Sequence, residues 1–211
     1  MTQQLRSTPT RPRKLDLPKM TYEQFLEWDF ENPHVEWVKG EVVMMAPVSN
    51  EHEDIRTFLI ALFRYVIDEQ ELGRLLGDPF QMKAGVDLPG RAPDIQFIAK
   101  RNLGRLKTNH LVGPADLVVE IISPGSRGTD RGDKYGEYEK GGVKEYWLLD
   151  PERKRAEFYR LGRDKQYHLV DVGGDGIFRS SVLKGVWLRV DWLWQRPLPK
   201  VGTVLKEWGL V

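Results

Sequence analysis

The segment Asp116-Leu-Val-Val-Glu-Ile-Ile-Ser-Pro124 decides the fold, because it has the pattern of a β-strand that is apolar on both faces. Such a strand lies in the middle of a sheet that is covered on both sides. Glu120 stands inside this run. An ionised carboxylate is costly to bury unless a cation, a metal ion or a raised pKa compensates for it. The segment therefore predicts a central strand that carries one compensated acid.

The regions around this strand alternate between helix and strand patterns. Apolar residues recur at three- and four-residue steps in one stretch and predict a helix: Ile55, Phe58, Leu59, Leu62, Val66 and Ile67. Asn50 and Glu53 fit a loose capping box for it, with Ser49 as a rival cap. We expect a hairpin at 35–47, turning at Lys39-Gly40, a weaker helix over 130–140, and strands over 72–85, 94–99, 117–122, 145–149 and 156–161. This order predicts a mixed α/β sandwich around one central sheet.

The composition narrows the possible functions. The 211 residues include 32 Lys and Arg against 31 Asp and Glu, so the net charge is +1. This excludes a whole-chain positive field that would hold nucleic acid without specific contacts. The absence of cysteine excludes disulfides, thiolate metal sites and cysteine nucleophiles. No apolar run approaches a membrane span and no apolar signal core opens the chain, so we expect a cytoplasmic protein outside the membrane.

The first 20 residues differ in composition from the rest. They hold five Lys or Arg against the single acid Asp16, and their three prolines argue against a helix. We expect residues 1–20 to form a basic, flexible arm, which is either solvated or in contact with phosphates. We expect residues 21–211 to form a single domain.

A second acid stands at the start of another predicted strand. Pro93 cannot donate a backbone hydrogen bond and belongs at the beginning of a strand, which places Asp94 at the rim of the sheet. If the strands of Asp94 and Glu120 are neighbours, the two carboxylates converge, and a divalent cation would relieve their repulsion. Because these ligands are oxygens only, Mg²⁺ or Mn²⁺ is favoured over Zn²⁺.

Three further side chains have the spacing of one helix face. Asp130, Lys134 and Tyr138 follow at four-residue steps. Beside a metal-bound water and a phosphate, Lys134 could orient the nucleophile or stabilise developing charge. The alternative is an exposed salt bridge between Lys134 and Asp130, which is a common and weak interaction.

Other candidates lie nearer the amino terminus. His52 lies in the first turn of the predicted helix, where it could face the same cleft or act as a capping or satisfied core histidine. Glu36 and Glu41 flank the hairpin turn. Either one could reach the site, and each could equally be an exposed strand residue.

A series of short blocks occurs in a specific order: Thr21-Tyr-Glu-Gln-Phe25, Val35-Glu36 with Gly40-Glu41, His52, Pro93-Asp94, Val119-Glu-Ile-Ile-Ser-Pro124, Asp130 with Lys134 and Tyr138, and Gly142-Val-Lys-Glu-Tyr-Trp-Leu-Leu-Asp-Pro151. They span residues 20–161. With these blocks the chain resembles the Uma-two endonuclease family of the PD-(D/E)XK restriction-endonuclease-like superfamily. The resemblance implies a mixed central sheet flanked by helices, with an added N-terminal hairpin.

The resemblance also implies an activity, which is the Mg²⁺- or Mn²⁺-dependent hydrolysis of DNA phosphodiester bonds. Asp94 and Glu120 match the two acids of the motif and would hold the metal, together with the backbone carbonyl of Ile122. Ile122 itself stands where the motif has its lysine, and Lys134 is the candidate for a lysine that has migrated.

The same resemblance assigns supporting roles. Asp130 and Tyr138 would orient Lys134, and Glu41 and His52 would lie in the outer shell of the metal. A set of basic residues flanks the Asp94 strand and would contact the DNA backbone or form a solvated loop: Arg91, Lys100, Arg101, Arg105 and Lys107.

Two other functions fit the same residues. One is a non-catalytic binding or scaffold protein, in which Lys134 neutralises Glu120 as a buried ion pair without a metal. The other is a metal-dependent hydrolase of a different phosphate ester. A homodimer is possible, since double-strand cutters are often paired. The tryptophans near the end would form a core edge, a dimer face or a base-stacking surface: Trp187, Trp192, Trp194 and Trp208.

Overall fold

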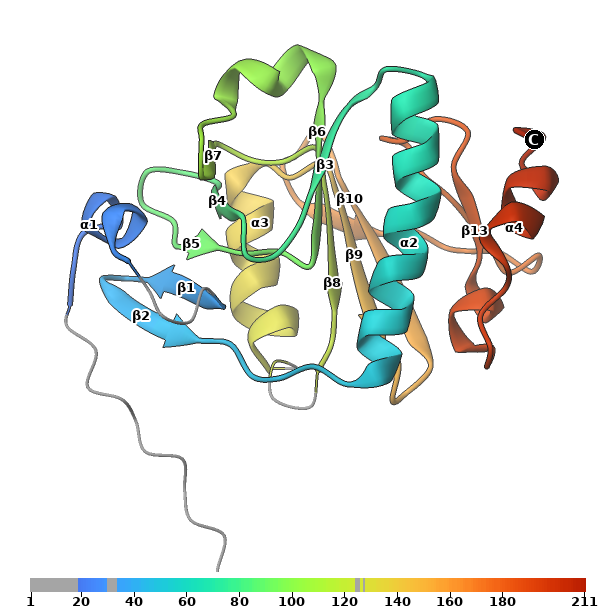
Figure 1. Cartoon of the computed structure of the whole chain (residues 1–211), viewed down its shortest axis with the longest axis horizontal. Helices are drawn as coiled ribbons and strands as arrows, with labels where there is room; N and C mark the ends of the chain where they lie inside the picture. The colour runs from blue at the N-terminus through green and yellow to red at the C-terminus, as the bar shows by residue number, and fades with distance from the viewer. Residues whose placement is uncertain (1–18, 30–33, 124–125, 127) are drawn as a thin grey trace, which may run out of the picture.

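The structure, a computed structural model, describes residues 19–29, 34–123, 126 and 128–211. The predicted basic arm therefore lies outside the described residues except for Lys19 and Met20. Figure 1 shows one large sheet with the long helix α2 (Asn50–Glu69) on one face and α3 (Tyr135–Gly141) on the other. A smaller sheet lies on the α3 side, so the chain is a mixed α/β protein in layers.

The large sheet has six strands in the order β11-β10-β9-β8-β6-β3. Only β8 and β9 pair in parallel, and the other neighbours are antiparallel. The strands are β3 (Gly73–Leu76), β6 (Ile95–Ala99), β8 (Leu117–Ile121), β9 (Glu145–Asp150), β10 (Arg155–Leu161) and β11 (Tyr167–Leu169). Every residue of β8 is buried, which confirms the prediction of a central strand covered on both faces.

The α2 face holds the larger core. The apolar stripe of α2 packs against strand residues such as Ile95 and Val119, which are fully buried. The helix begins after Ser49, whose hydroxyl accepts a hydrogen bond from the backbone N–H of His52, so Asn50 as the cap is wrong and Ser49 is right. Further C-terminal elements complete this layer: β12 (Ile177–Arg179), β13 (Trp187–Arg189), η3 (Val190–Trp194) and α4 (Val201–Glu207).

The four C-terminal tryptophans join this core. The rings of Trp187 and Trp192 lie 5.4 Å apart, and those of Trp187 and Trp208 lie 6.4 Å apart. Trp187, Trp194 and Trp208 are partly buried against the α2 core, and Trp192 is buried within it. Packing at a core edge is therefore confirmed for these side chains.

The α3 face holds a second core and the smaller sheet, in the order β2-β1-β5-β4-β7. Its elements are α1 (Tyr22–Glu27), β1 (Val35–Val38), β2 (Glu41–Met44), β4 (Gln81–Lys83), β5 (Gly90–Arg91) and β7 (His110–Val112). The expected central sheet is therefore present, and a smaller sheet that the sequence did not predict is added to it. The segment 72–85 is not one strand, because a turn at Gly77–Phe80 interrupts it, where Pro79 offers no N–H. Its two halves, β3 and β4, join different sheets.

The predicted helix at 130–140 starts as a π-helical segment, η2 (Thr129–Lys134), and continues as α3. It ends at Gly142, which adopts φ +89° and donates its N–H to the carbonyl of Tyr138, as left-handed helix ends do. Among the described helices, none is long and apolar enough to cross a membrane.

Candidate active site

Strand register brings Asp94 and Glu120 together. In the antiparallel β6–β8 pair, Ile95 lies opposite Val119 and Gln96 lies opposite Val118. One residue further along, Asp94 lies opposite Glu120. Side chains directly opposite on neighbouring strands share a face, with Cβ atoms about 4.5–5.5 Å apart. Because side chains alternate along a strand, both carboxylates point to the α3 face, away from the core beneath α2.

Asp94 is held from two elements. Its Oδ2 accepts a hydrogen bond of 2.6 Å from the backbone N–H of Ile121 and lies 3.2 Å from Nε2 of His52. Asp94 is 7% exposed and His52 is 2% exposed. The first turn of α2 thus brings His52 to the rim of the sheet, in contact with the carboxylate. The structure favours the cleft-facing orientation of His52 over an uninvolved core histidine.

Glu120 is buried and held at one oxygen. Its Oε1 accepts a hydrogen bond of 2.6 Å from the hydroxyl of Tyr138 and lies 3.1 Å from Nζ of Lys134. Burial raises the pKa of Glu120 well above that of an ordinary glutamate, while the charge of Lys134 opposes this shift. Tyr138 thus orients Glu120 directly, and its predicted role in orienting Lys134 stays a prediction.

Lys134 lies at the centre of a cluster of carboxylates. Besides Glu120, its Nζ lies 3.2 Å from Oδ1 of Asp130 and 3.4 Å from Oε1 of Glu36. Burial alone would lower the pKa of Lys134, but these acids raise it well above the usual value, so the side chain stays cationic. Lys134 is only 3% exposed, and the alternative of a surface salt bridge with Asp130 is therefore wrong.

Glu36 is a site residue that the sequence singles out only weakly. Its Oε2 lies 2.8 Å from Nη1 of Arg91, and its Oε1 accepts from the backbone N–H of Ala92 at 3.2 Å. Burial raises the pKa of Glu36, yet Lys134 and Arg91 together bring it below the ordinary value. The sequence signals for Glu36 are its position beside a hairpin turn and its place in one of the matching blocks, and Glu41 shares both.

Arg91 is also buried and holds a second acid. It binds Glu137 through two hydrogen bonds of 2.7 and 2.9 Å. Its exposed fraction is 4%, so a role for Arg91 in a basic patch for DNA is wrong. The pair instead connects β5 with α3 and places Glu36 beside Lys134. Such a bidentate contact is a strong and directional form of ion pair.

These side chains line a cavity of about 290 Å³ between β1, β2, the start of α2 and η2. Its other walls are apolar or carry hydroxyls, including Met44, Val48, Ser123 and Thr129. Five carboxylates and two basic groups line it: Glu36, Asp94, Glu120, Asp130 and Asp133 against Arg91 and Lys134. With every group ionised, the cavity carries three excess negative charges. A cation at this position would therefore be stabilised electrostatically.

The oxygen atoms at the cavity fit a hard divalent cation. Both hydrogen-bond partners of Asp94 use Oδ2, and both partners of Glu120 use Oε1. The second oxygen of each carboxylate accepts no hydrogen bond from another described residue. No group of three or more His, Asp or Glu side chains in this part of the chain is arranged to hold a metal. Two carboxylates, completed by water and phosphate, are nevertheless a common arrangement for Mg²⁺.

Several predicted site residues lie elsewhere. Glu41 on β2 is exposed and lies 3.4 Å from Lys19, because β2 turns only Val42 inward, so its place in the outer metal shell is wrong. The side chain of Ile122 is buried in the core on the α3 side, and its N–H donates to the carbonyl of Leu149 at 2.7 Å. Metal ligation by the carbonyl of Ile122 stays a prediction.

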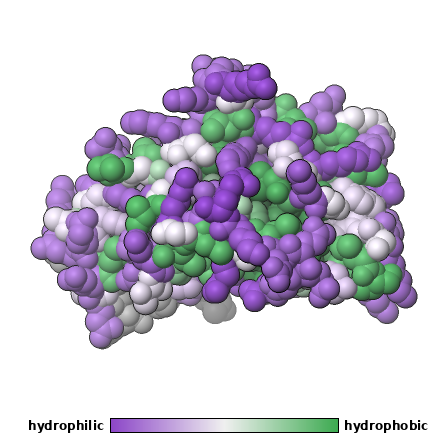
Figure 2. Space-filling view, turned by 90° about the horizontal axis from the view of Figure 1, so that it is seen from above, coloured by the Kyte–Doolittle hydropathy of each residue, from purple (hydrophilic) through white to green (hydrophobic). Residues whose placement is uncertain are grey.

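The remaining basic residues lie at the far end of β6. They are in or directly after η1 (Lys100–Arg105), where Lys100 pairs with Glu71 and Arg101 with Asp116. The five residues of β6 separate them from Asp94 by about 17 Å, at roughly 3.3 Å a residue. Figure 2, which views the molecule from above, shows mainly hydrophilic side chains over this end. The patch is therefore solvated and distant from the candidate site.

The fold and this acidic, lysine-containing cavity define a protein of the restriction-endonuclease-like class. The profile of the Uma2 family, described as "Putative restriction endonuclease", matches residues 22–191. The chain belongs to this family.

The chain is also similar to two known proteins. The uncharacterized protein sll1609 of Synechocystis sp. is 24% identical over 141 residues, which cover 66% of this chain and 79% of that protein. A crystal structure from Anabaena variabilis, described as a putative nuclease belonging to DUF820, superposes with a TM-score of 0.68 at 18% identity. It covers 83% of this chain and 97% of that one. At this identity the similarity establishes the shared fold.

Proposed function

We propose that the protein is a metal-dependent endonuclease that hydrolyses DNA phosphodiester bonds. One observation carries the proposal: Asp94 and Glu120 meet across neighbouring strands, each with one oxygen left for a cation, beside the ammonium group of Lys134. This arrangement supplies the three groups that the chemistry needs. The names of the family and of the structural neighbour support the same reaction class.

Asp94 and Glu120 would hold Mg²⁺ or Mn²⁺. A bound ion of this kind lowers the pKa of a water ligand and withdraws charge from the phosphate. Lys134 lies 3.1 Å from Glu120 and stays cationic, so it can orient the attacking water or neutralise charge that develops on the phosphate. Asp130 and Glu36 position Lys134, while Tyr138 and His52 each fix one carboxylate.

Plasmid cleavage tests this proposal. Purified protein is incubated with supercoiled DNA and Mg²⁺ or Mn²⁺, alongside Asp94→Asn, Glu120→Gln and the matched control Glu41→Gln. We expect the first two variants to nick at least ~100-fold more slowly, since loss of metal-ion catalysis removes several kcal/mol of transition-state stabilisation. The exposed control should retain full activity. Nicking that persists in both site variants, or wild-type protein that is inactive with either metal, would contradict the proposal.

A non-catalytic binding protein is a second candidate, favoured by the 3.1 Å ion pair between Lys134 and Glu120. In that case the lysine alone compensates the acid. Calorimetric titration separates the two functions, because only the nuclease is expected to bind Mn²⁺ in a manner that depends on Asp94. Cleavage of bis-p-nitrophenyl phosphate without cleavage of DNA would instead indicate a hydrolase of another phosphate ester.

A further inference from the structure

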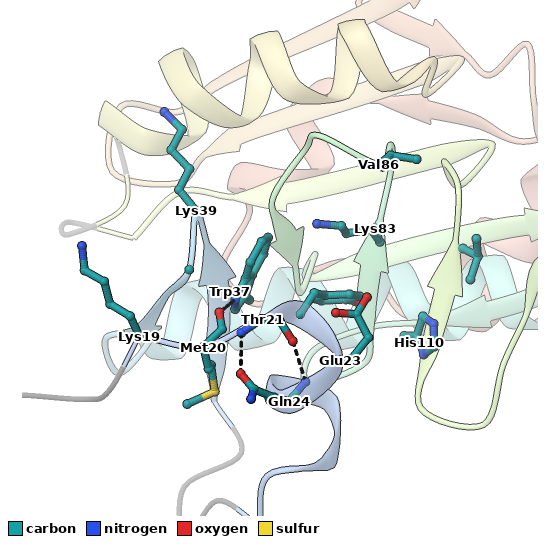
Figure 3. A pocket seen from close by; sticks show the side chains of 13 residues that line it. Lys19, Met20, Thr21, Glu23, Gln24, Trp37, Lys39, Lys83, Val86 and His110 are labelled. Carbon is teal, nitrogen blue, oxygen red and sulfur yellow. Dashed lines mark hydrogen bonds between the residues drawn. The ribbon is translucent and has the colours of Figure 1, made fainter.

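A second and larger cavity, of about 830 Å³, lies behind the candidate active site. Glu36 and Trp37 are consecutive residues of β1, so their side chains point to opposite faces of the smaller sheet. Glu36 reaches the acidic cluster, whereas Trp37 lines the second cavity (Figure 3). The β1–β2 hairpin is thus a shared wall: Met44 faces the candidate site, and the Lys39-Gly40 turn edges the second cavity.

The cavity has a fixed aromatic floor. The rings of Tyr22 and Trp37 lie 5.5 Å apart, and the indole N–H of Trp37 donates to the carbonyl of Met20 at 2.8 Å. Tyr22 packs so closely on the backbone of β5 that a Cβ at Gly90 would lie 2.3 Å from its ring. Trp37 itself is only partly buried. A half-open indole that is already held in place can stack on a planar ligand at little entropic cost.

Lysines surround this floor. Nζ of Lys83 lies 4.1 Å from the ring centre of Trp37 and 4.7 Å from that of Tyr22. Burial lowers the pKa of Lys83, because removing its ammonium group from water against the rings costs free energy. Figure 3 shows Lys39 and Lys19 extending from the rim on the same side as Trp37. Glu23 is the one acid among the described lining residues, which leaves a surplus of positive charge.

We propose that this cavity binds a single-stranded segment of nucleic acid, with one base stacked on Trp37 and the adjacent phosphates beside Lys39 and Lys83. Lysines around an exposed aromatic ring are the recurring means of holding such strands without sequence preference. The positive surplus complements phosphate, in contrast to the acidic cavity on the other side of the hairpin. The inference rests on the proposed nuclease function, since the bound strand would be part of the substrate that passes around β2 to the cleavage centre.

Fluorescence anisotropy with a labelled dT12 oligonucleotide in EDTA tests the site without cleavage. We expect Trp37→Leu to bind about tenfold more weakly, through lost stacking. We expect Lys39→Gln to flatten the dependence of log K on log salt concentration by about 0.7, the contribution of one phosphate contact on a single strand. Lys100→Gln, an exposed lysine at the far end of β6, is the matched control and should bind as the wild type does.

Two results would overturn the inference: unchanged affinity and salt slope in Lys39→Gln, or no binding of dT12 by the wild type. Lys39 is exposed at a turn, so its variant tests the site even if Trp37→Leu fails to fold. Plasmid cleavage without binding of dT12 defeats this inference and leaves the nuclease proposal standing. Binding that depends on Lys39 in a protein that cleaves nothing defeats the nuclease proposal alone.

Discussion

Replacing Lys134 by methionine tests, through the free energy of unfolding, how strongly this lysine compensates the carboxylates of the candidate site. The change keeps most of the aliphatic stem and removes the ammonium group from between three carboxylates, at 3.1, 3.2 and 3.4 Å. At an effective dielectric constant of about 20, each contact corresponds to a Coulomb attraction of about 5 kcal/mol. The desolvation of Lys134 offsets much of this sum. Breaking a buried ion pair from one side costs about 3–5 kcal/mol net.

The loss should depend on pH. Burial raises the pKa values of Glu120 and Asp130, so these acids accept protons more readily than exposed acids do, and the loss of the lysine strengthens this tendency. At pH 8 a larger fraction of both acids is charged than at pH 5, and in the variant this charge has lost its counter-charge. We therefore expect Lys134→Met to lose about 3–5 kcal/mol at pH 8 and less than this at pH 5.

Urea denaturation in EDTA, followed by circular dichroism at both pH values, measures these losses. Lys100→Met serves as the control, because Lys100 forms an exposed 2.9 Å pair with Glu71 and its removal should cost less than about 1 kcal/mol. Adding Glu120→Gln to Lys134→Met should restore part of the stability at pH 8, since one uncompensated charge is removed. A loss at pH 8 no larger than that of the control, or equal losses at pH 5 and pH 8, would refute the reasoning.

Two further predictions concern single groups. Because the pKa of Glu120 is raised, the folded protein keeps a proton that the unfolded chain has already released, so the stability of the metal-free protein should fall as pH rises above about 4.5. Urea titrations at a series of pH values should show a weaker fall for Glu120→Gln. The same pH dependence in this variant and the wild type would contradict the prediction. The hydroxyl of Tyr22 is buried and has no partner among the described residues. Tyr22→Phe should therefore stabilise the protein by about 1 kcal/mol, with a higher midpoint in thermal unfolding, whereas a lower midpoint would show that the hydroxyl is satisfied.

Local sequence patterns predict the framework of the site well. The apolar run around Glu120 predicts a covered central strand, and Pro93 places Asp94 at the start of another strand. The stripe from Ile55 to Ile67 predicts α2. These features are local, because strand and helix periods are set within a few residues of the backbone. The sequence also predicts that the negative charge of Glu120 needs a partner, since a buried charge is costly and this cost does not depend on which residue supplies the partner.

The choice among candidate side chains required the tertiary structure. Glu36 and Glu41 look alike in the sequence, yet the pleat of the hairpin buries the first beside Lys134 and exposes the second beside Lys19. Arg91 reads as part of a basic loop, and only the approach of α3 converts it into a buried partner of Glu137.

The sequence by itself determined that Asp94 stands at the start of one strand and that Glu120, inside a covered strand, needs a counter-charge. The tertiary structure decided which cation supplies it, namely Lys134, and which further acids surround that cation. The physical reason is distance along the chain. Glu36 and Lys134 come from elements almost one hundred positions apart, and nothing short of the packing of the smaller sheet and η2 against the central sheet brings them within 3.4 Å.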